Sequence, residues 1–269
     1  MMILNIIGAG HVGQTLGHLF VKHQLVSVGG IYNRTRESAM DAIRFIGQGS
    51  YCATIAELPH ADITLITTPD DCIAKTCSSL ALNRHIHAGD IVMHCSGALS
   101  SDCLFSMKER GGLVASVHPM RSFKQPAISV QEYIGTYCAM EGDEQALAVL
   151  GSLFEAIGSK THIIKKDKKT LYHAAAVFAS NYLITLSQQA LECLNEAGIE
   201  HDIAMPLIVG IMQSTLTNLT ILQSPKQALT GPVQRKDLAT IERHRAAFTN
   251  IQQRELYEKL MEATKNIVD

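Results

Sequence analysis

The sequence predicts an α/β protein, in which an N-terminal Rossmann-like, doubly wound and mostly parallel sheet is followed by an all-α C-terminal domain. Three observations predict this fold class. Short apolar runs alternate with helical patterns in the first part of the chain, a glycine-rich turn follows the first run, and only helical patterns occur near the C-terminus. We therefore expect two domains, residues 1–165 and residues 166–269.

The first domain is expected to alternate strands and helices. Apolar runs predict strands at residues 2–7, 26–32, 51–54, 62–67, 91–94, 113–117, 135–140 and 161–164. Helical spacing of apolar residues predicts helices at residues 12–20, 37–45, 70–80, 101–110 and 144–157. The helix at 70–80 has a helix-start signal, with Thr68 as the N-cap and Pro69 at the first helical position.

The second domain is expected to contain helices alone. The charged segment IIKKDKK, residues 163–169, is predicted to be solvated. After it, helical patterns cover residues 169–197, 202–222, 237–250 and 252–267. The first of these helices would run roughly 44 Å at 1.5 Å per residue, a length typical of a helix at a domain interface or in a dimer.

Composition limits the possible partners. Lys and Arg number 23 against 25 Asp and Glu, which gives a net charge of -2 and no basic surplus for nucleic acid. The N-terminal apolar run ends at Gly8 and is too short for a signal peptide or a membrane span. We therefore expect a cytoplasmic protein with a small-molecule substrate, and neither a nucleic-acid nor a membrane partner.

The seven cysteines are scattered and form no C-x-x-C pair, so reduced thiols are expected. The pair His85-x-His87, and the set of His94, Cys95 and Cys103, lack a recognised ligand spacing. The sequence therefore predicts no metal site.

A glycine motif opens the chain. The segment Gly8-Ala9-Gly10-His11-Val12-Gly13 matches G-x-G-x-x-G between a predicted strand and a predicted helix. In such a motif the first glycine makes the tight turn, the second admits a pyrophosphate, and the third allows close helix packing. We expect Gly8, Gly10, His11, Val12 and Gly13 to bind a dinucleotide at the helix N-terminus. A glycine turn without a ligand is the alternative.

The end of the second strand indicates which dinucleotide. An NAD site usually has an acidic residue there, but this chain has Asn33-Arg34-Thr35-Arg36. A guanidinium can bond a 2′-phosphate bidentately, whereas a carboxylate would repel it. The sequence therefore predicts NADP, with Asn33, Arg34 and Thr35 in its site. Solvated arginines before a helix are the alternative.

Several motifs together carry a family resemblance. They are GAGHVG, YNRT, TTPDD, HCSGALSSD, SVHPMRSF, LYHAAAVFASNYL and ALTGPVQRKD. They resemble a family that joins a Rossmann-like domain to a C-terminal helical domain of unknown function. That family is similar to the 6-phosphogluconate and β-hydroxyacid dehydrogenases and to the pyrroline-5-carboxylate reductases. The resemblance implies that the nicotinamide lies between the domains, that Thr68, Pro69, Ser96 and Gly97 flank the cofactor, and that the helical domain forms a homodimer.

Catalytic candidates lie on the first helix of the second domain. In the similar dehydrogenases a lysine followed four residues later by asparagine carries catalysis, but alignment on Asn181 puts Val177 at the lysine position. Helical offsets place His173, Ser180 and Asn181 on one face of the expected helix. Histidine titrates near neutral pH, so His173 could donate a proton while Asn181 orients the substrate. A core histidine bonded to a neighbouring helix is the alternative.

His118 follows a strand and is expected to contact the substrate. The leading hypothesis is an NADP-dependent oxidoreductase that moves a hydride between nicotinamide and a carbonyl or imine carbon of a small metabolite. A non-catalytic NADP(H)-binding sensor, prompted by the missing lysine, is the alternative. A reductase that uses a deazaflavin beside NADP is a third possibility.

Overall fold

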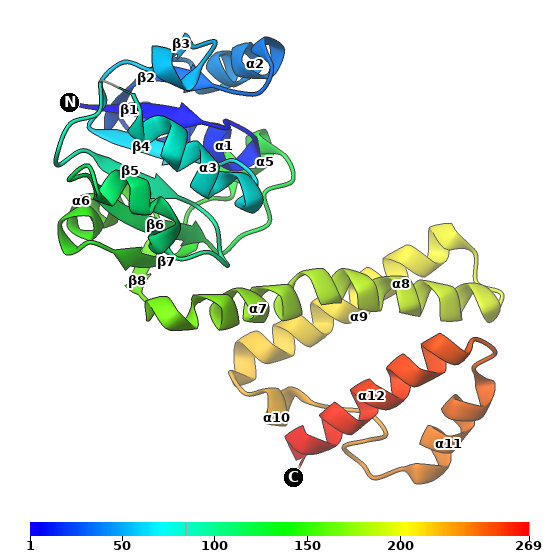
Figure 1. Ribbon diagram of the computed structural model, residues 1–269. Helices are drawn as coiled ribbons and strands as arrows, with labels where there is room; N and C mark the ends of the chain where they lie inside the picture. The colour runs from blue at the N-terminus through cyan, green and yellow to red at the C-terminus, as the bar shows by residue number, and fades with distance from the viewer. Residues whose placement is uncertain (84, 269) are drawn as a thin grey trace. The chain divides into compact units, whose positions relative to one another are not determined.

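The computed structural model describes residues 1–83 and 85–268. The chain divides into two compact units, Met1–Ser180 and Asn181–Asp269, which are drawn in Figure 1. The predicted fold class is confirmed, since a mostly parallel sheet with helices precedes a helical region. The division after Ser180 groups the first helix beyond residue 165 with the sheet, and the predicted domain boundary at 165 stays a prediction.

One eight-stranded sheet forms the centre of the first unit. Its strands are β1 (Met2–Ile7), β2 (Val26–Tyr32), β3 (Ser50–Tyr51), β4 (Ile63–Ile66), β5 (Ile91–His94), β6 (Leu113–Pro119), β7 (Tyr137–Gly142) and β8 (Lys160–Ile163). They lie in the order β3-β2-β1-β4-β5-β6-β7-β8, and only the β6–β7 pair is antiparallel. The order reverses direction between β1 and β4, and ligands of such sheets bind at this switch point.

Helices cover both faces of this sheet (Figure 1). The helices of the first unit are α1 (His11–Lys22), α2 (Arg36–Ile46), α3 (Asp70–Ala81), α4 (Phe105–Lys108), α5 (Pro126–Gln131), α6 (Glu144–Ala156) and α7 (Lys169–Ala179), with short 3-10 turns at Ile55–Glu57, Ser101–Leu104 and Lys166–Lys168. Apolar residues of α1, α2 and α6 build one core layer, and those of α3 and α4 build the other. Burial on both faces explains why the central strands are continuous apolar runs.

Most differences from the expected elements are small. The helix expected at 101–110 is a 3-10 turn followed by the short helix α4, and α5 was not expected. Pro69 is the N-cap of α3, so Thr68 does not cap that helix as the sequence predicted. β7 ends at Gly142, which pairs with Ala115 of β6, and the N–H of the next residue, Asp143, donates to the Val114 carbonyl oxygen at 2.9 Å.

The prediction of a single long helix at residues 169–197 is wrong. The chain leaves the helical conformation at Ser180, whose φ of -124° and ψ of -69° end α7. A second helix, α8 (Asn181–Glu196), then begins at once. The face that would have joined His173 to Ser180 and Asn181 is therefore interrupted.

The second unit contains the remaining helices of the described chain. These are α8, α9 (His201–Leu222), α10 (Pro225–Ala228), α11 (Leu238–Ala247) and α12 (Ile251–Val268). α8 packs on α9, and α12 contacts α10 and α11. Asp237 caps α11, where its carboxylate accepts a hydrogen bond from the Thr240 N–H at 3.0 Å.

α9 is apolar and long. By length and composition it is the one helix in the described residues that could cross a membrane, and 6% of its apolar window is buried. A single helix of this kind is weak evidence for a span. An exposed apolar helix also suits an interface with another protein chain.

Candidate functional site

The strands β1, β2, β4, β5 and β6 are parallel, so their carboxyl ends lie on the same side of the sheet, which we call the carboxyl edge. The predicted cofactor residues follow these strands in sequence, and His118 is the penultimate residue of β6. The structure thus brings them to one edge of the first unit. This edge is the candidate functional site.

The three motif glycines differ in their surroundings. Gly8 has a φ of +81°, and a Cβ there would lie 2.7 Å from Thr68 Cγ2. A Cβ on Gly13 would lie 2.5 Å from Thr67 Oγ1, so this glycine permits close packing of α1 on the sheet. A Cβ on Gly10 would have no protein atom closer than the Gly8 carbonyl oxygen at 3.9 Å. Protein packing therefore explains Gly8 and Gly13 but leaves space in front of Gly10.

Two features near this turn leave polar groups without a partner. Gly10 is the N-cap of α1 and offers no side chain to the N–H groups of the first helical turn. Thr68 lies beside Gly8, and its Oγ1 is buried and has no hydrogen-bond partner within the described chain. Buried hydroxyls normally have a partner, so both features fit the binding of a phosphate-bearing cofactor.

Asn33 holds the glycine turn. Its Oδ1 accepts a hydrogen bond from the Ala9 N–H at 2.6 Å, and its Nδ2 donates to the Ser38 hydroxyl at 3.3 Å. Thr35 is the N-cap of α2, since its hydroxyl accepts from the Ser38 N–H. Both predicted cofactor residues are therefore engaged in local structure.

Arg34 is different from its neighbours. It is exposed, and no described residue forms an ion pair with it. The guanidinium of Arg36 lies over the Tyr51 ring, with its carbon 5.6 Å from the ring centroid. Neither arginine forms an ion pair within the described residues, but Arg36 is held by the Tyr51 ring, so Arg34 is the better candidate for an anionic ligand.

His11 and Val12 are also held by the protein. His11 Nδ1 lies 2.9 Å from the Phe123 carbonyl oxygen, and Val12 packs against the apolar core. What these two residues offer a ligand is therefore their backbone N–H groups at the start of α1.

The loop after β5 is organised by the Ser96 hydroxyl. It donates to Asp70 Oδ2 at 2.8 Å and accepts from the N–H groups of Ala98 and Leu99. Gly97 is buried, and a Cβ there would clash with His173 Cδ2 and lie 2.8 Å from His118 Nε2. Gly97 thus makes room for two histidines.

The two histidines and a tyrosine form a cluster beside Gly97. The ring centroids of His118 and His173 are 5.9 Å apart, and His118 Nδ1 lies 3.3 Å from the Tyr172 hydroxyl oxygen. Burial, His173 and Lys169 lower the pKa of His118 to about 4, so its ring is neutral at pH 7. Burial raises the pKa of Tyr172 to about 12, so its hydroxyl keeps its proton. His118 and His173, predicted as site residues, are brought together.

Sequence reasoning missed a buried ion pair next to this cluster. Lys169 Nζ lies 3.1 Å from Glu141 Oε1 and also bonds the Ser116 hydroxyl, and the lysine and glutamate side chains are 1% and 3% exposed. Glu141 further accepts bonds from the Ser101 N–H and hydroxyl at 2.8 and 2.7 Å. Burial lowers the pKa of Lys169, and Glu141 opposes that effect.

Lys169 precedes His173 by four residues. Alignment with the similar dehydrogenases put Val177 at the position of their lysine, four residues before Asn181, whereas Lys169 and His173 have the same spacing two helical turns earlier. The four-residue spacing could have identified Lys169 as a candidate. It was not considered because Lys169 ends a charged run that was predicted to be solvated. Its ion pair with Glu141 directs the ammonium group into the first unit.

His94 is a structural residue of the same region. It is fully buried, and its Nδ1 accepts from the Ser96 N–H while its Nε2 lies 3.2 Å from the Ser100 carbonyl oxygen. Burial and Lys169 lower its pKa to about 4. A neutral ring with its proton on Nε2 satisfies both contacts.

Ser180 and Asn181 are not joined to the histidine cluster by a continuous helix. Ser180 is the exposed C-cap of α7, and Asn181 is the first residue of α8 in the second unit. The single helical face on which their catalytic roles were predicted is interrupted at Ser180, and those roles stay predictions.

Several solved structures are similar to this chain. Protein TM1727 from Thermotoga maritima is 26% identical, with a TM-score of 0.75 and 98% of each chain covered. An imine reductase from Myxococcus stipitatus in complex with NADP+ is 13% identical over 99% of this chain and 92% of that chain, with a TM-score of 0.69. A pyrroline carboxylate reductase from Plasmodium falciparum with NADP bound is 14% identical over 100% and 98%, with a TM-score of 0.61. The chain thus resembles NADP-dependent oxidoreductases in structure, at low identity.

Family models match both parts of the chain, whereas no curated protein sequence matches it. Residues 2–119 match the model of a Rossmann-like domain, and residues 136–264 match a domain of unknown function, DUF2520. These matches confirm the resemblance drawn from the motifs. The chain therefore combines a Rossmann-like domain with a C-terminal DUF2520 domain.

Proposed function

We propose that this protein is an NADP-dependent oxidoreductase that transfers a hydride between nicotinamide and a carbonyl or imine carbon of a small metabolite. The observation that carries the proposal is the glycine turn. Its open space at Gly10, its uncapped helix N-terminus and the unpartnered Thr68 hydroxyl all fit a dinucleotide. The structural likeness to NADP-bound reductases supports the same cofactor.

In this proposal the N–H groups at the start of α1 bind the pyrophosphate, and Arg34 binds the 2′-phosphate. Asn33 acts indirectly by fixing the turn. The bound cofactor would supply the hydride acceptor or donor. The Ser96 hydroxyl fixes the loop after β5, and Gly97 leaves room in that loop for the rings of His118 and His173.

His173 is proposed to donate the proton that accompanies reduction of the carbonyl or imine. It is half-buried beside neutral His118 and lies against Gly97, in the loop that follows β5. The proton goes to the oxygen or nitrogen of the reacting double bond, and the hydride goes to its carbon. In this proposal His118 contacts the substrate.

Titration of the purified full chain with NADPH and with NADH tests the cofactor preference. A panel of carbonyl and imine metabolites, monitored by the loss of NADPH absorbance, then tests the activity. We expect tighter binding of NADPH and oxidation by some members of the panel. NADH binding at least as tight as NADPH binding would contradict the role of Arg34. Tight NADPH binding without oxidation across a broad panel would favour the non-catalytic sensor.

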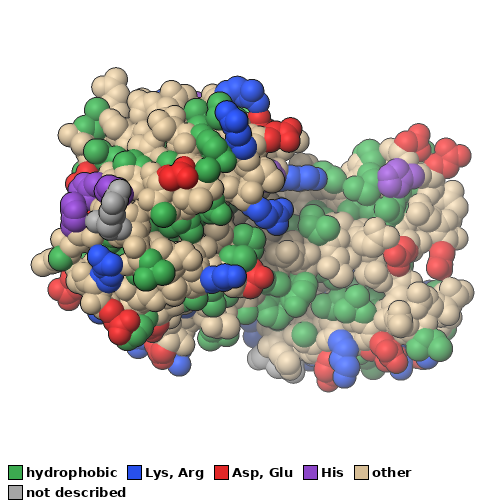
Figure 2. Space-filling view, turned by 45° about the horizontal axis from the view of Figure 1, so that its top comes forward, with side chains coloured by type: hydrophobic (Ala, Val, Ile, Leu, Met, Phe, Trp, Pro, Cys, Tyr) green, Lys and Arg blue, Asp and Glu red, His purple; other side chains and the backbone are tan. Residues whose placement is uncertain are grey.

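We further propose that the protein is a cytoplasmic homodimer formed through the helical unit. Figure 2 shows hydrophobic side chains on the surface of the molecule, and large ones are exposed along α9. The most exposed are Ile203, Leu207, Ile211, Leu216 and Ile221, at 49–72%. Such apolar surface is a typical feature of oligomer interfaces.

A further inference from the structure

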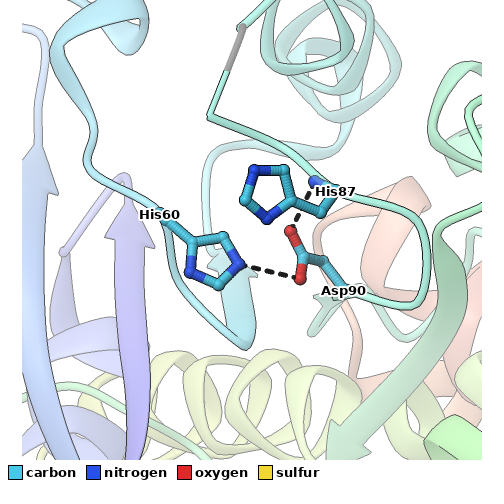
Figure 3. Close-up of side chains that lie close together, drawn as sticks. All are labelled: His60, His87 and Asp90. Carbon is cyan, nitrogen blue, oxygen red and sulfur yellow. Dashed lines mark hydrogen bonds and ion pairs between the residues drawn. The ribbon is translucent and has the colours of Figure 1, made fainter.

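We propose that His60, His87 and Asp90 form a binding site for a divalent transition-metal ion of the zinc class. The ligand atoms of the three side chains lie within 4.8 Å of one another. Figure 3 shows the carboxylate of Asp90 between the His60 ring and the backbone of His87. Two imidazoles and one carboxylate are a donor set that suits Zn²⁺ and leaves further positions for water.

The fold brings these residues to one place. His60 precedes β4, and His87 and Asp90 precede β5, which pairs in parallel with β4 at Ile63 and Ile91. The amino ends of both strands therefore meet at one edge of the sheet, opposite the edge that carries the glycine turn. The proposed ion would connect two loops far from the nucleotide and would act on stability.

The cluster is held in place before any ion binds. Asp90 is 8% exposed, and its Oδ2 accepts from the His87 N–H at 2.7 Å. Leu58 and Ile86, both buried, anchor the backbone beside His60 and His87. Preorganised ligands lower the entropy cost of binding.

The two imidazole rings lie face to face, with centroids 4.4 Å apart and an interplanar angle of 27°. His60 Nε2 lies 3.1 Å from Asp90 Oδ1. With the His60 proton on Nδ1, that Nε2 becomes a ligand for an ion that Asp90 also binds. Tetrahedral zinc needs ligand atoms roughly 3.3 Å apart, so the loops would close slightly around it.

Spacing along the sequence could not reveal this site. The prediction of no metal site considered His85 with His87, whereas His60 and Asp90 lie 30 residues apart in the chain. Only the pairing of β4 with β5 brings them together.

Zinc titration of the full chain after treatment with a chelator tests the proposal by calorimetry and thermal unfolding. We expect one ion per chain and a rise in melting temperature of roughly 5–10 °C at a hundredfold excess over Kd. His60→Gln and His87→Gln are each expected to weaken zinc binding on the order of tenfold or more. His23→Gln, at an exposed histidine that ends α1, is the matched control and should bind zinc as the wild type does.

The Asp90→Asn variant distinguishes the role of Asp90 as a metal ligand from its role in stabilising the loop. The amide can accept from the His87 N–H and donate to His60, so the metal-free melting temperature should stay near the wild-type value. Zinc binding should still fall on the order of tenfold, because the charge is lost. Absence of a zinc-dependent shift in the wild type, or equal zinc affinity in the His60→Gln and His87→Gln variants, would overturn the proposal.

Discussion

His173 is the residue on which the proposed chemistry depends. If it is the proton donor, His173→Ala should lower turnover roughly 10²–10⁴-fold while NADPH affinity stays unchanged. Steady-state rates on a substrate found in the metabolite panel would measure this. Tyr172→Phe is the neighbouring control, because it removes the hydroxyl that lies 3.3 Å from His118 and keeps the ring. A rate unaffected by His173→Ala would reject the assigned role.

Arg34 decides the choice between NADP and NAD. Loss of a charge-assisted bond to the 2′-phosphate should weaken NADPH binding on the order of 10- to 100-fold in Arg34→Ala. NADH lacks that phosphate, so its affinity should not change. Arg36→Ala is the matched control, since its guanidinium packs on Tyr51. Fluorescence titration of both variants with both cofactors measures the difference, and equal losses in the two variants would contradict the assignment.

The buried position of Lys169 could not be predicted from the sequence. Within the run KKDKK it has the same neighbours as exposed lysines, and only the fold places Glu141 and Ser116 around it. The carboxylate comes from β7, which sequence predicts as a strand without giving its direction or partner. His118, by contrast, was predictable because a polar residue ending an apolar strand lies at the ligand edge of a parallel sheet.

At the scale of elements, the turn between β1 and α1 allows the fold and the cofactor site to be tested separately. Gly10→Ala adds a methyl group that meets no protein atom within 3.9 Å, so the free energy of unfolding should change by about 1 kcal/mol or less. The methyl group should nevertheless obstruct a pyrophosphate and strongly weaken NADPH binding.

Gly13→Ala is the contrasting variant. Its methyl group would lie 2.5 Å from Thr67 Oγ1, and such overpacking typically costs about 1–3 kcal/mol. Chemical denaturation and NADPH titration of both variants distinguish the two effects. Wild-type NADPH affinity in Gly10→Ala would contradict a close approach of the cofactor at this residue.

Strands were predicted better than helix ends. The strands β1, β2 and β5 have the expected bounds, because apolar runs buried on both faces are distinctive. The break at Ser180 was missed because Phe178, Ala179, Asn181 and Tyr182 continue a helical pattern across it. Helical periodicity records which side chains are apolar, and it does not record a local change of φ and ψ.

At the scale of the whole molecule, buried histidines should make stability depend on pH. His94 and His118 have pKa values of about 4 when folded, against 6.5 as the ordinary value. Between these values the unfolded chain binds more protons, so the free energy of unfolding rises as pH rises. The stabilisation is complete above pH 6.5 and is lost as pH falls toward 4.

Urea denaturation between pH 4 and pH 7 measures this slope. For fully buried His94 the contribution is about 3 kcal/mol across the window. His94→Asn keeps an acceptor for the Ser96 N–H and should flatten the pH dependence by about that amount. An unchanged slope in this variant would show that His94 does not stay neutral in the folded protein.

The exposed apolar face of α9 makes the proposed homodimer testable. Ile211 is 69% exposed, and a dimer through this face would bury it. Ile211→Glu would place a carboxylate in that interface, where desolvation of the charge opposes association. Sedimentation should therefore give a dimer for the wild type and a monomer for the variant.

Leu82→Glu is the control for a charge added at an exposed apolar position. Leu82 is 84% exposed and lies at the end of α3 in the first unit. Its substitution should leave the dimer intact, because the proposed interface involves the helical unit alone. A monomeric wild type at tens of micromolar, or equal dissociation in both variants, would contradict an interface on α9. A dimer that survives Ile211→Glu would place the contact on another face of the helical unit.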